Sequence, residues 1–597
     1  MRAISIRRTL SVLATTAAVL VFPAAPAAAQ RATATGTGGG AASVDALATR
    51  AATAALRDGA NAVDAAVAAA GVLGVTEPYS CGIGGGGFMV IRTARGKVTT
   101  IDSREAAPAT MQPDSFLENG TVLGFDAARY SGLSAGTPGT VRGWDTALRS
   151  YGTWSLRRAL RSGIRVAREG FTVDQTFVSQ TQPNVDYFDD VPSTAALYLD
   201  PDGTPRDVGS RLRNPDLART YERIASRGAD GFYRGPVAGA MVAAAQTPPI
   251  AAGANHTWRR GLLTASDLRR YRARERKPAR IGYRGLAVYG MGPPSSGGST
   301  VAEALNILEG YDLSALDRTR ALQLFLEASR YSFADRNAYV ADPAFFDVPL
   351  GGLLSNSFAA ERRALISRTR AATSPVAAGN PYDDQGTATA GPPATAATST
   401  RPQSTTHLVV SDADGNVVSY TFTIESTGGN GIVVPGQGFL LNNELTDFNI
   451  DSTTHPNRAD GLKRPRSSMA PTIVLDGRRP VLAVGSPGGA TIITTVLQVL
   501  IERLDLGQTL PEAIAAARAS QRNTATTQAE AAFIASPEGR ALADPATFGQ
   551  RFVPTAEIGA TTGLEFLSRG RVLAAAEPTR RGGGSASVAP RGTPGRR

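Results

Sequence analysis

A run of small and polar residues interrupts the chain between two well-patterned regions and constrains how the chain can fold. Residues 369–404, "TRAATSPVAAGNPYDDQGTATAGPPATAATSTRPQS", carry almost no large apolar side chains and cannot form a core. At Thr405 the pattern changes abruptly to alternating apolar and polar residues. We expect the run to be disordered, either as an interdomain linker or as the segment in front of a cleavage site.

The stretch after the run predicts a β-hairpin with one definite register. "DADG" at Asp412–Gly415 suits a type I turn with Gly415 in the left-handed conformation. Pairing about Asp414 places Thr405 directly across from Thr423, on a face lined by hydroxyl groups, and shifting the register by one residue would mix the two faces. The opposite face, which we expect to be buried, holds Leu408, Val410, Val418, Tyr420 and Phe422.

Composition and the location of the charges argue against a nucleic-acid-binding protein. The 597 residues are 42% hydrophobic and are enough for one large domain or two. The formal charge of +11 is concentrated at the ends, because three arginines lie in the first eight residues and five lie in a Gly/Pro-rich tail. The nearly neutral body and 6% aromatic content give no sign of nucleic-acid binding. We expect residues 578–597 to be a solvated, disordered basic tail, and residues 30–42 to be flexible.

The first residues indicate export. Residues 1–29 have a basic start, an apolar core and an Ala-x-Ala site before Gln30, which together predict a signal peptide. The alternative is an N-terminal membrane anchor, although the apolar run is short for a spanning helix. We therefore expect a secreted, periplasmic or cell-envelope protein with no stable membrane insertion after the signal is removed. Cys81 is the only cysteine, so no intrachain disulfide can form.

Other motifs give little support for metal or cofactor chemistry. Gly82-x-Gly84-x-x-Gly87 has the spacing of a dinucleotide fingerprint, but a strand-like run follows where a helix is required. The three histidines share no ligand spacing, so we expect no metal and no cofactor. Strand-like runs mixed with helical ones predict an α/β or α+β layered sandwich.

Taken together, the motifs resemble one family. "TTH", "DADGN", "YTFT", "GIVV", "GFLLNNELTDF", "KRPRSSMAPTIV" and "GSPGGATIITTVLQ" follow Ser404 in order. Upstream, "DGANAVDAAVAA", "GGGGFMVIR", "IDSREAAP", "GTPGTVRGW", "YRGLAVYGMGPPSSGG" and "FADRNAYVADPAF" also occur in order. This set resembles the gamma-glutamyltransferases, also called glutathione hydrolases, over nearly the whole mature chain.

The resemblance implies an α/β fold, the four-layer αββα sandwich of the N-terminal nucleophile hydrolases. In such enzymes two subunits cut from one precursor form the fold jointly. Here they would be a large subunit, residues 30–404, and a small catalytic subunit, residues 405–597, separated at the Ser404–Thr405 bond. The freed α-amine of Thr405 would serve as base for its own hydroxyl nucleophile. By the same resemblance Thr423 would orient Thr405, and the N–H groups of Gly488 and Gly489 would form an oxyanion hole.

The resemblance also implies a γ-glutamyl donor, such as glutathione, and an amino-acid or dipeptide acceptor. Arg104, Ser467 and Ser468 match residues that bind the donor α-carboxylate, and Glu444 and Asp447 match residues that bind its α-ammonium. Glu425 departs from the family, which usually has asparagine there. Two alternatives remain: an acylase of the same fold acting on glutaryl or cephalosporin side chains, and an uncleaved, non-catalytic binding protein. Glu425 argues against the acylase, because an added negative charge gains nothing without a cation to bind.

Overall fold

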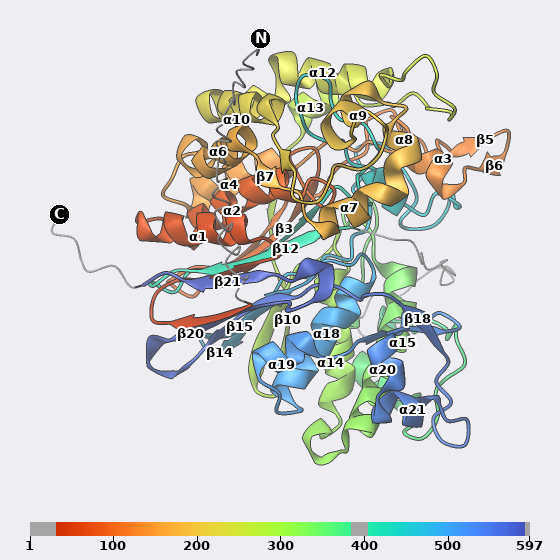
Figure 1. The fold of residues 1–597 in the computed structure, drawn as a ribbon. Helices are drawn as coiled ribbons and strands as arrows, with labels where there is room; N and C mark the ends of the chain where they lie inside the picture. Colours follow the sequence, from red (N-terminus) through yellow and green to blue (C-terminus); the bar gives the residue numbers. More distant parts are fainter. Residues whose placement is uncertain (1–31, 384–403, 591–597) are drawn as a thin grey trace, which may run out of the picture.

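Two antiparallel sheets of seven strands each are stacked face to face in the computed structural model, which describes residues 32–383 and 404–590 (Figure 1). The signal peptide predicted for residues 1–29 lies outside the described residues, as do residues 384–403. Helices cover the outer face of each sheet, above and below in the view of Figure 1. The predicted four-layer αββα sandwich is therefore confirmed.

The first sheet, called the hairpin sheet below, has the predicted hairpin at its centre. Its order is β21 (Ser585–Val588), β2 (Gly40–Ser43), β12 (Thr406–Ser411), β13 (Val417–Thr423), β3 (Gly86–Arg92), β4 (Val98–Asp102) and β9 (Arg274–Arg276). The second sheet has the order β1 (Thr33–Gly36), β20 (Val572–Ala576), β19 (Thr562–Phe566), β15 (Arg479–Gly485), β14 (Thr472–Asp476), β11 (Leu286–Gly290) and β10 (Ala279–Tyr283). Each sheet contains strands from both sides of Thr405, so neither half of the chain can complete a sheet alone.

Three apolar cores hold the layers together. Val409, Val417 and Ile473 belong to the core between the two sheets. The helices over the hairpin sheet include α1 (Ala46–Arg57), α2 (Ala62–Thr76), α4 (Thr140–Tyr151), α6 (Arg161–Glu169), α10 (Pro215–Arg227) and α12 (Gly235–Gln246). Those over the second sheet include α14 (Gly297–Glu309), α15 (Arg318–Tyr339), α17 (Asn356–Ala364), α18 (Thr491–Leu504), α19 (Leu510–Ala515) and α21 (Pro537–Ala543).

Helix α2 shows why an alanine-rich segment suits the layer against the hairpin sheet. Asn61 caps it through a capping box with Asp64, and every residue of the helix is buried. Small side chains let such a helix approach its neighbours closely, while larger groups fill the adjoining space. One of these groups is the buried Trp144 of α4, whose Nε1 donates to the Tyr420 hydroxyl of β13 at 3.1 Å.

The hairpin has the predicted register. Thr406 pairs with Phe422 and His407 with Thr421, which places Thr405 opposite Thr423, and Gly415 has φ of +92°. The predicted buried face packs against the helices as expected. The hydroxyl-lined face is also buried, because the second sheet covers it.

Two segments, residues 33–43 and residues 369–383, are more ordered than the sequence predicts. In residues 369–383, the Val376 N–H donates to Asn523 Oδ1 at 2.7 Å and the Gly379 N–H to Asp335 Oδ1 at 2.6 Å. The prediction of disorder is therefore wrong for this part of residues 369–404. Residues 33–36 and 40–43, expected to be flexible, form strands β1 and β2. In both places backbone groups form hydrogen bonds with polar side chains or with sheet edges, so few apolar side chains are needed.

The prediction of a disordered basic tail is also wrong for residues 578–590. Strand β21 pairs with β2 at the edge of the hairpin sheet. Arg580 is 8% exposed and makes ion pairs with Glu577 at 2.9 Å and with Glu530. Arg580, which the sequence predicts to be solvated, instead neutralises buried carboxylates. Its pairing with Glu530 joins residues far apart in the sequence, so composition cannot reveal it.

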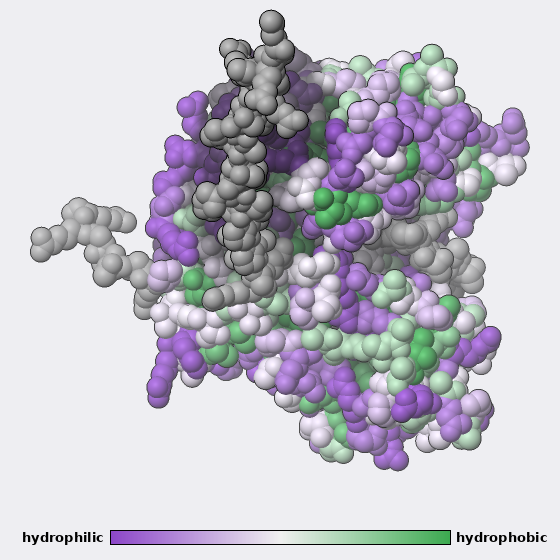
Figure 2. Space-filling model, viewed as in Figure 1, coloured by the Kyte–Doolittle hydropathy of each residue, from purple (hydrophilic) through white to green (hydrophobic). Residues whose placement is uncertain are grey.

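Among residues 32–383 and 404–590 no helix is long and apolar enough to cross a membrane. On the face shown in Figure 2, hydrophobic residues (green) form small patches among hydrophilic ones (purple).

Truncation distinguishes an ordered C-terminal segment from a disordered tail. A chain ending at Pro590 should match the full chain in melting temperature. A chain ending at Glu577 should lose about 3–5 kcal/mol, because buried Glu530 is left without its cation and β2 without its neighbour. Thermal unfolding followed by circular dichroism measures this, and equal melting temperatures for the two truncated chains would contradict the fold described for this segment.

Candidate active site

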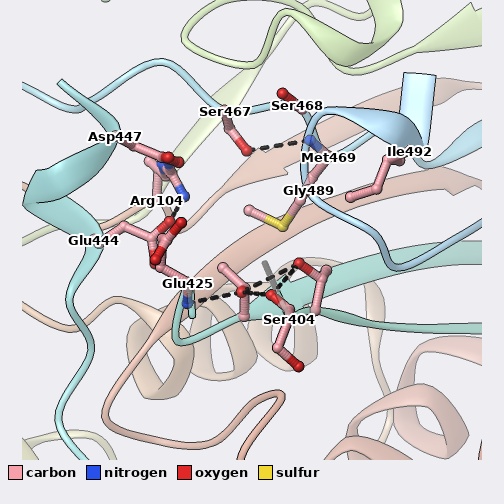
Figure 3. Close-up of a pocket in the computed structure, with 12 residues that line it drawn as sticks. Arg104, Ser404, Glu425, Glu444, Asp447, Ser467, Ser468, Met469, Gly489 and Ile492 are labelled. Atoms are coloured by element: carbon pink, nitrogen blue, oxygen red, sulfur yellow. Dashed lines mark hydrogen bonds and ion pairs between the residues drawn. The ribbon is translucent and has the colours of Figure 1, made fainter. Parts of the chain in front are cut away.

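One pocket gathers the site residues that the sequence predicts from six separate segments (Figure 3). About 260 Å³ of space, part of it open to solvent, lies among its lining atoms. Two of its residues, Met469 and Ile492, were not predicted, although each lies close to a predicted residue in the sequence. Every predicted residue except Gly488 lines it, namely Arg104, Ser404, Thr405, Thr423, Glu425, Glu444, Asp447, Ser467, Ser468 and Gly489.

Two threonine hydroxyls converge on one backbone carbonyl. Thr405 stands just before β12 and Thr423 ends β13, and the Thr405 hydroxyl donates to Thr423 Oγ1 at 3.3 Å. The Thr423 hydroxyl donates to the carbonyl oxygen of Ser404 at 2.8 Å, and the Thr405 hydroxyl contacts the same oxygen. The Glu425 N–H donates to Thr423 Oγ1 at 2.9 Å and fixes that rotamer. Both hydroxyls are thus held against the peptide bond that precedes Thr405.

The backbone around this bond is anchored on both sides. The Ser404 N–H donates to the Glu425 carbonyl at 2.8 Å, and the Ser404 hydroxyl donates to Ser80 Oγ at 2.9 Å. The Thr405 carbonyl accepts from Arg581 Nη1 at 2.7 Å. Neither Ser80 nor Arg581 was predicted, because only the tertiary fold brings them to Thr405.

The two glycines lie in the loop between β15 and α18. Gly488 has φ of +130° and Gly489 has φ of +57°, a region that favours glycine. A Cβ on Gly488 would lie 2.7 Å from Thr491 Oγ1. The positive φ and the lack of room for a Cβ therefore both require glycine at this position.

Arg104 is the central charge of the pocket. It is 1% exposed, pairs with Glu444 and with Asp447 at 2.5 Å, and donates to the carbonyls of Pro465 and Arg466 at 3.1 and 3.0 Å. The arginine predicted to bind a carboxylate is thus paired with the acids predicted to bind an ammonium group.

Carboxylates are numerous around this arginine. Glu105, missed by sequence reasoning although it adjoins Arg104, lies 3.8 Å from Arg104 Nη1 and is fully buried. Burial raises the pKa of Glu105 to about 7, and Arg104 opposes that rise. Burial raises the pKa of Glu425 to about 7 as well, with Asp447 adding to the shift and the Ser426 and Asn443 hydrogen bonds opposing it. Near neutral pH the cluster therefore holds protons that an incoming cation can displace.

The serine pair lines the pocket across from Ser404 in the view of Figure 3. The Met469 N–H donates to Ser467 Oγ at 3.2 Å, and Arg336 of α15 donates through Nη2 to Ser468 Oγ at 2.8 Å. Burial lowers the pKa of Arg336 well below its usual value, and the neighbouring Arg466 adds to this effect. An anion bound at Ser468 would lie next to this buried arginine.

Metal chemistry has no visible support in this pocket. Within the described part of the chain, no group of three His, Cys, Asp or Glu side chains is arranged to hold a metal ion.

The fold, with Thr405 just before the central strand β12, is that of the N-terminal nucleophile hydrolases. The sequence model of the family described as Gamma-glutamyltranspeptidase matches residues 48–587, so the chain belongs to that family and is an enzyme of it.

Named relatives fall into two groups. The glutathione hydrolase proenzyme of Bacillus subtilis (strain 168) is 40% identical over 466 residues, which are 77% of this chain and 76% of that protein. The Acylase ACY 1 proenzyme of Pseudomonas sp. (strain V22) is 36% identical over 473 residues, 77% of this chain and 78% of that protein. The crystal structure of a cephalosporin acylase from Bacillus halodurans superposes with a TM-score of 0.80 at 26% identity and covers 95% of this chain and 99% of that one.

Removing the cation from the carboxylate cluster should destabilise the protein in a pH-dependent way. Arg104→Met should cost about 3–5 kcal/mol at pH 8, because buried Glu444 and Glu105 lose their counter-charge. The cost should shrink at pH 5, where these carboxyls take up protons and become neutral. Melting temperatures at the two pH values measure the effect.

Arg234→Met is the matched control, because its ion pair with Asp230 is more than half exposed on both sides and should contribute little. Equal losses for Arg104→Met at both pH values would contradict the description of the cluster.

Proposed function

We propose that this protein is an exported, self-processing gamma-glutamyltransferase whose nucleophile is Thr405. The observation that carries the proposal is the convergence of the Thr405 and Thr423 hydroxyls on the Ser404 carbonyl. Family membership and relatives named as proenzymes support it. The signal-like residues 1–29 support export.

Processing begins with the bond in front of Thr405. The Thr405 hydroxyl oxygen attacks the Ser404 carbonyl carbon, the C–N bond breaks, and the amide becomes an ester with a free Thr405 α-amine. Thr423 donates to the carbonyl oxygen, where negative charge develops during the attack. Water then hydrolyses the ester and leaves a carboxylate on Ser404 and a free hydroxyl on Thr405. The products are a large subunit, residues 30–404, and a small subunit, residues 405–597, which stay together because each sheet needs strands of both.

Turnover uses the same hydroxyl with its new base. A free α-amine with a pKa of about 7.7–8.0 accepts the hydroxyl proton as Thr405 attacks the γ-carbonyl of the donor. The N–H groups of Gly488 and Gly489 stabilise the oxyanion, each contributing about 3–4 kcal/mol. The donor amine leaves with a proton, and water or the amine of an amino-acid or dipeptide acceptor then takes the γ-glutamyl group from Thr405.

Donor recognition follows from the charges of the pocket. Arg104, Ser467 and Ser468 bind the α-carboxylate, with the arginine presenting two donors to it. The α-ammonium binds among Glu425, Glu444 and Asp447. A zwitterionic donor therefore replaces the internal ion pairs of Arg104 with ion pairs of its own, and no buried charge is left without a partner. Glutathione and other γ-glutamyl amides fit this requirement.

The relatives named as acylases support a second candidate, an acylase for glutaryl or cephalosporin side chains. A glutaryl group carries the distal carboxylate without the adjacent ammonium. Binding it would draw Arg104 from Glu444 and Asp447 and leave these carboxylates facing an anion. The abundance of carboxylates therefore favours the γ-glutamyl donor. An uncleaved binding protein is the third candidate, and the intact pair of hydroxyls disfavours it.

A matched pair of substrates separates the first two candidates. γ-Glutamyl and glutaryl amides of one chromogenic amine differ only in the α-ammonium group. We expect kcat/KM to be at least about 100-fold higher for the γ-glutamyl amide, because a site built for a polar group rejects the analogue that lacks it. Equal or higher values for the glutaryl amide would establish an acylase, and no turnover of either would favour the binding protein.

Glu425 should give donor binding its pH dependence. Its carboxyl is neutral below its pKa of about 7 and charged above it, so KM for the donor should fall as the pH rises through 7. Glu425→Asn should remove this step and raise KM at pH 8 about tenfold, because one charged partner of the ammonium is lost. Steady-state kinetics from pH 5.5 to pH 8.5 measures both effects.

Glu361→Gln, an exposed change on α17, should leave the profile unaltered. An unshifted profile in Glu425→Asn would remove Glu425 from donor binding.

A further inference from the structure

The C-terminal segment brings a cation to the nucleophile residue. Arg581 Nη1 donates to the Thr405 carbonyl at 2.7 Å, while Nη2 lies 3.1 Å from Glu77 Oε2 and also donates to Ser80 Oγ. Strand β12 begins at Thr406, so the Thr405 carbonyl lies just outside the ladder. Within the described residues, Arg581 is the side chain that holds this carbonyl.

Through Ser80, the Arg581 guanidinium is also linked to Ser404, on the other side of the Ser404–Thr405 bond. The Ser404 hydroxyl donates to Ser80 Oγ at 2.9 Å, and the Ser80 hydroxyl donates to Glu77 Oε2 at 3.3 Å. Arg581 contacts Ser80, Glu77 and Thr405 together, so it connects both residues of the Ser404–Thr405 bond to the C-terminal end of helix α2, which Glu77 caps.

The backbone holds Arg581 in place at some conformational cost. Its φ of +55° is uncommon for a residue other than glycine, and such residues persist where the surroundings fix them. The Arg581 N–H donates to Glu557 Oε2 at 3.1 Å, and the adjacent Arg580 is buried in ion pairs. Gly582 and Gly583 follow with φ of +76° and +82° and lead the chain into β21. These contacts leave the guanidinium little freedom.

We infer that Arg581 is a positioning residue for Thr405, required for the cut at Ser404–Thr405 and, afterwards, for turnover by the mature enzyme. This inference rests on the proposed function. Cleavage releases the Ser404 contacts, but the hydrogen bond from Arg581 to the Thr405 carbonyl lies within residues 405–597 and remains. Through Glu77 the same guanidinium joins the small subunit to the large one.

The location of Arg581 sets the kinetic effect that its loss should have. Arg581 does not line the pocket, so it acts on Thr405 and not on the donor. After the cut, no preceding peptide bond orients Thr405. A hydrogen bond to its carbonyl is then the main backbone contact that can fix the orientation of the residue. Misplacing a reacting group by about 1 Å costs on the order of 100-fold in rate. Loss of Arg581 should therefore lower kcat and leave KM nearly unchanged.

The test compares three variants of the full chain. We expect Arg581→Met to slow the cut, followed by denatured mass against time, and to lower kcat about 10- to 100-fold, with KM for a γ-glutamyl amide within about twofold of wild type. Arg581→Lys keeps the charge beside Glu77 and one donor, and should recover part of both rates. Arg569→Met, an exposed arginine of the turn before β20, is the matched control and should behave as wild type. If Arg581→Met does not fold, Arg581→Lys decides in its place.

Two results would overturn the inference. One is unchanged cleavage and kcat in both Arg581 variants. The other is a fall in kcat that comes with an equal rise in KM and a lower melting temperature, as general loosening of the fold would produce. A Thr405→Ala variant separates this from failure of the proposed function. If Thr405→Ala is cut like wild type, the proposed function fails; if it stays uncut while the Arg581 variants are normal, only the role of Arg581 is lost.

Discussion

The register of the β12–β13 hairpin is the constraint on which the rest of the site depends. Pairing Thr406 with Phe422 sets Thr405 opposite Thr423, and a slip of one residue in either strand would turn the hydroxyl of that strand toward the helical layer. Apolar burial on both faces enforces the register, because the hairpin lies at the centre of its sheet between the α2 layer and the second sheet. The packing that stabilises the sandwich therefore also fixes the position of Thr405, the proposed nucleophile.

Opposite charges are paired with one another in the pocket next to this hairpin. Arg104 is buried with Glu444 and Glu105 and also pairs with the partly exposed Asp447. Burying this many acids around one arginine is costly unless a second cation binds there. Such a cluster is costly to bury and is retained where it serves binding. The zwitterionic donor proposed above would fit this cluster, because each of its charges would replace one that is already present. Under this proposal, specificity arises from the exchange of ion-pair partners and does not require added contact area.

The sequence could predict features that depend on neighbours in the chain. The turn at Asp412–Gly415 and the hairpin register follow from local pattern and turn chemistry. The layered sandwich and the site residues came from ordered motifs that resemble a family, since periodicity alone left an α/β or α+β fold open. Arg580 and Arg581 were misread because their partners, Glu530 and Thr405, are distant in sequence. Residues 369–383 were misread for the same reason, because the partners that order them, Asp335 of α15 and Asn523, are distant in sequence.

The central claim is that cutting the chain at Thr405 creates both nucleophile and base. The most direct test is the mass of purified, denatured wild-type protein beside that of Thr405→Ala. We predict two wild-type fragments, the smaller beginning at Thr405, and a single uncut Thr405→Ala chain. A single uncut wild-type chain, or a cut that persists unchanged in Thr405→Ala, would contradict the account.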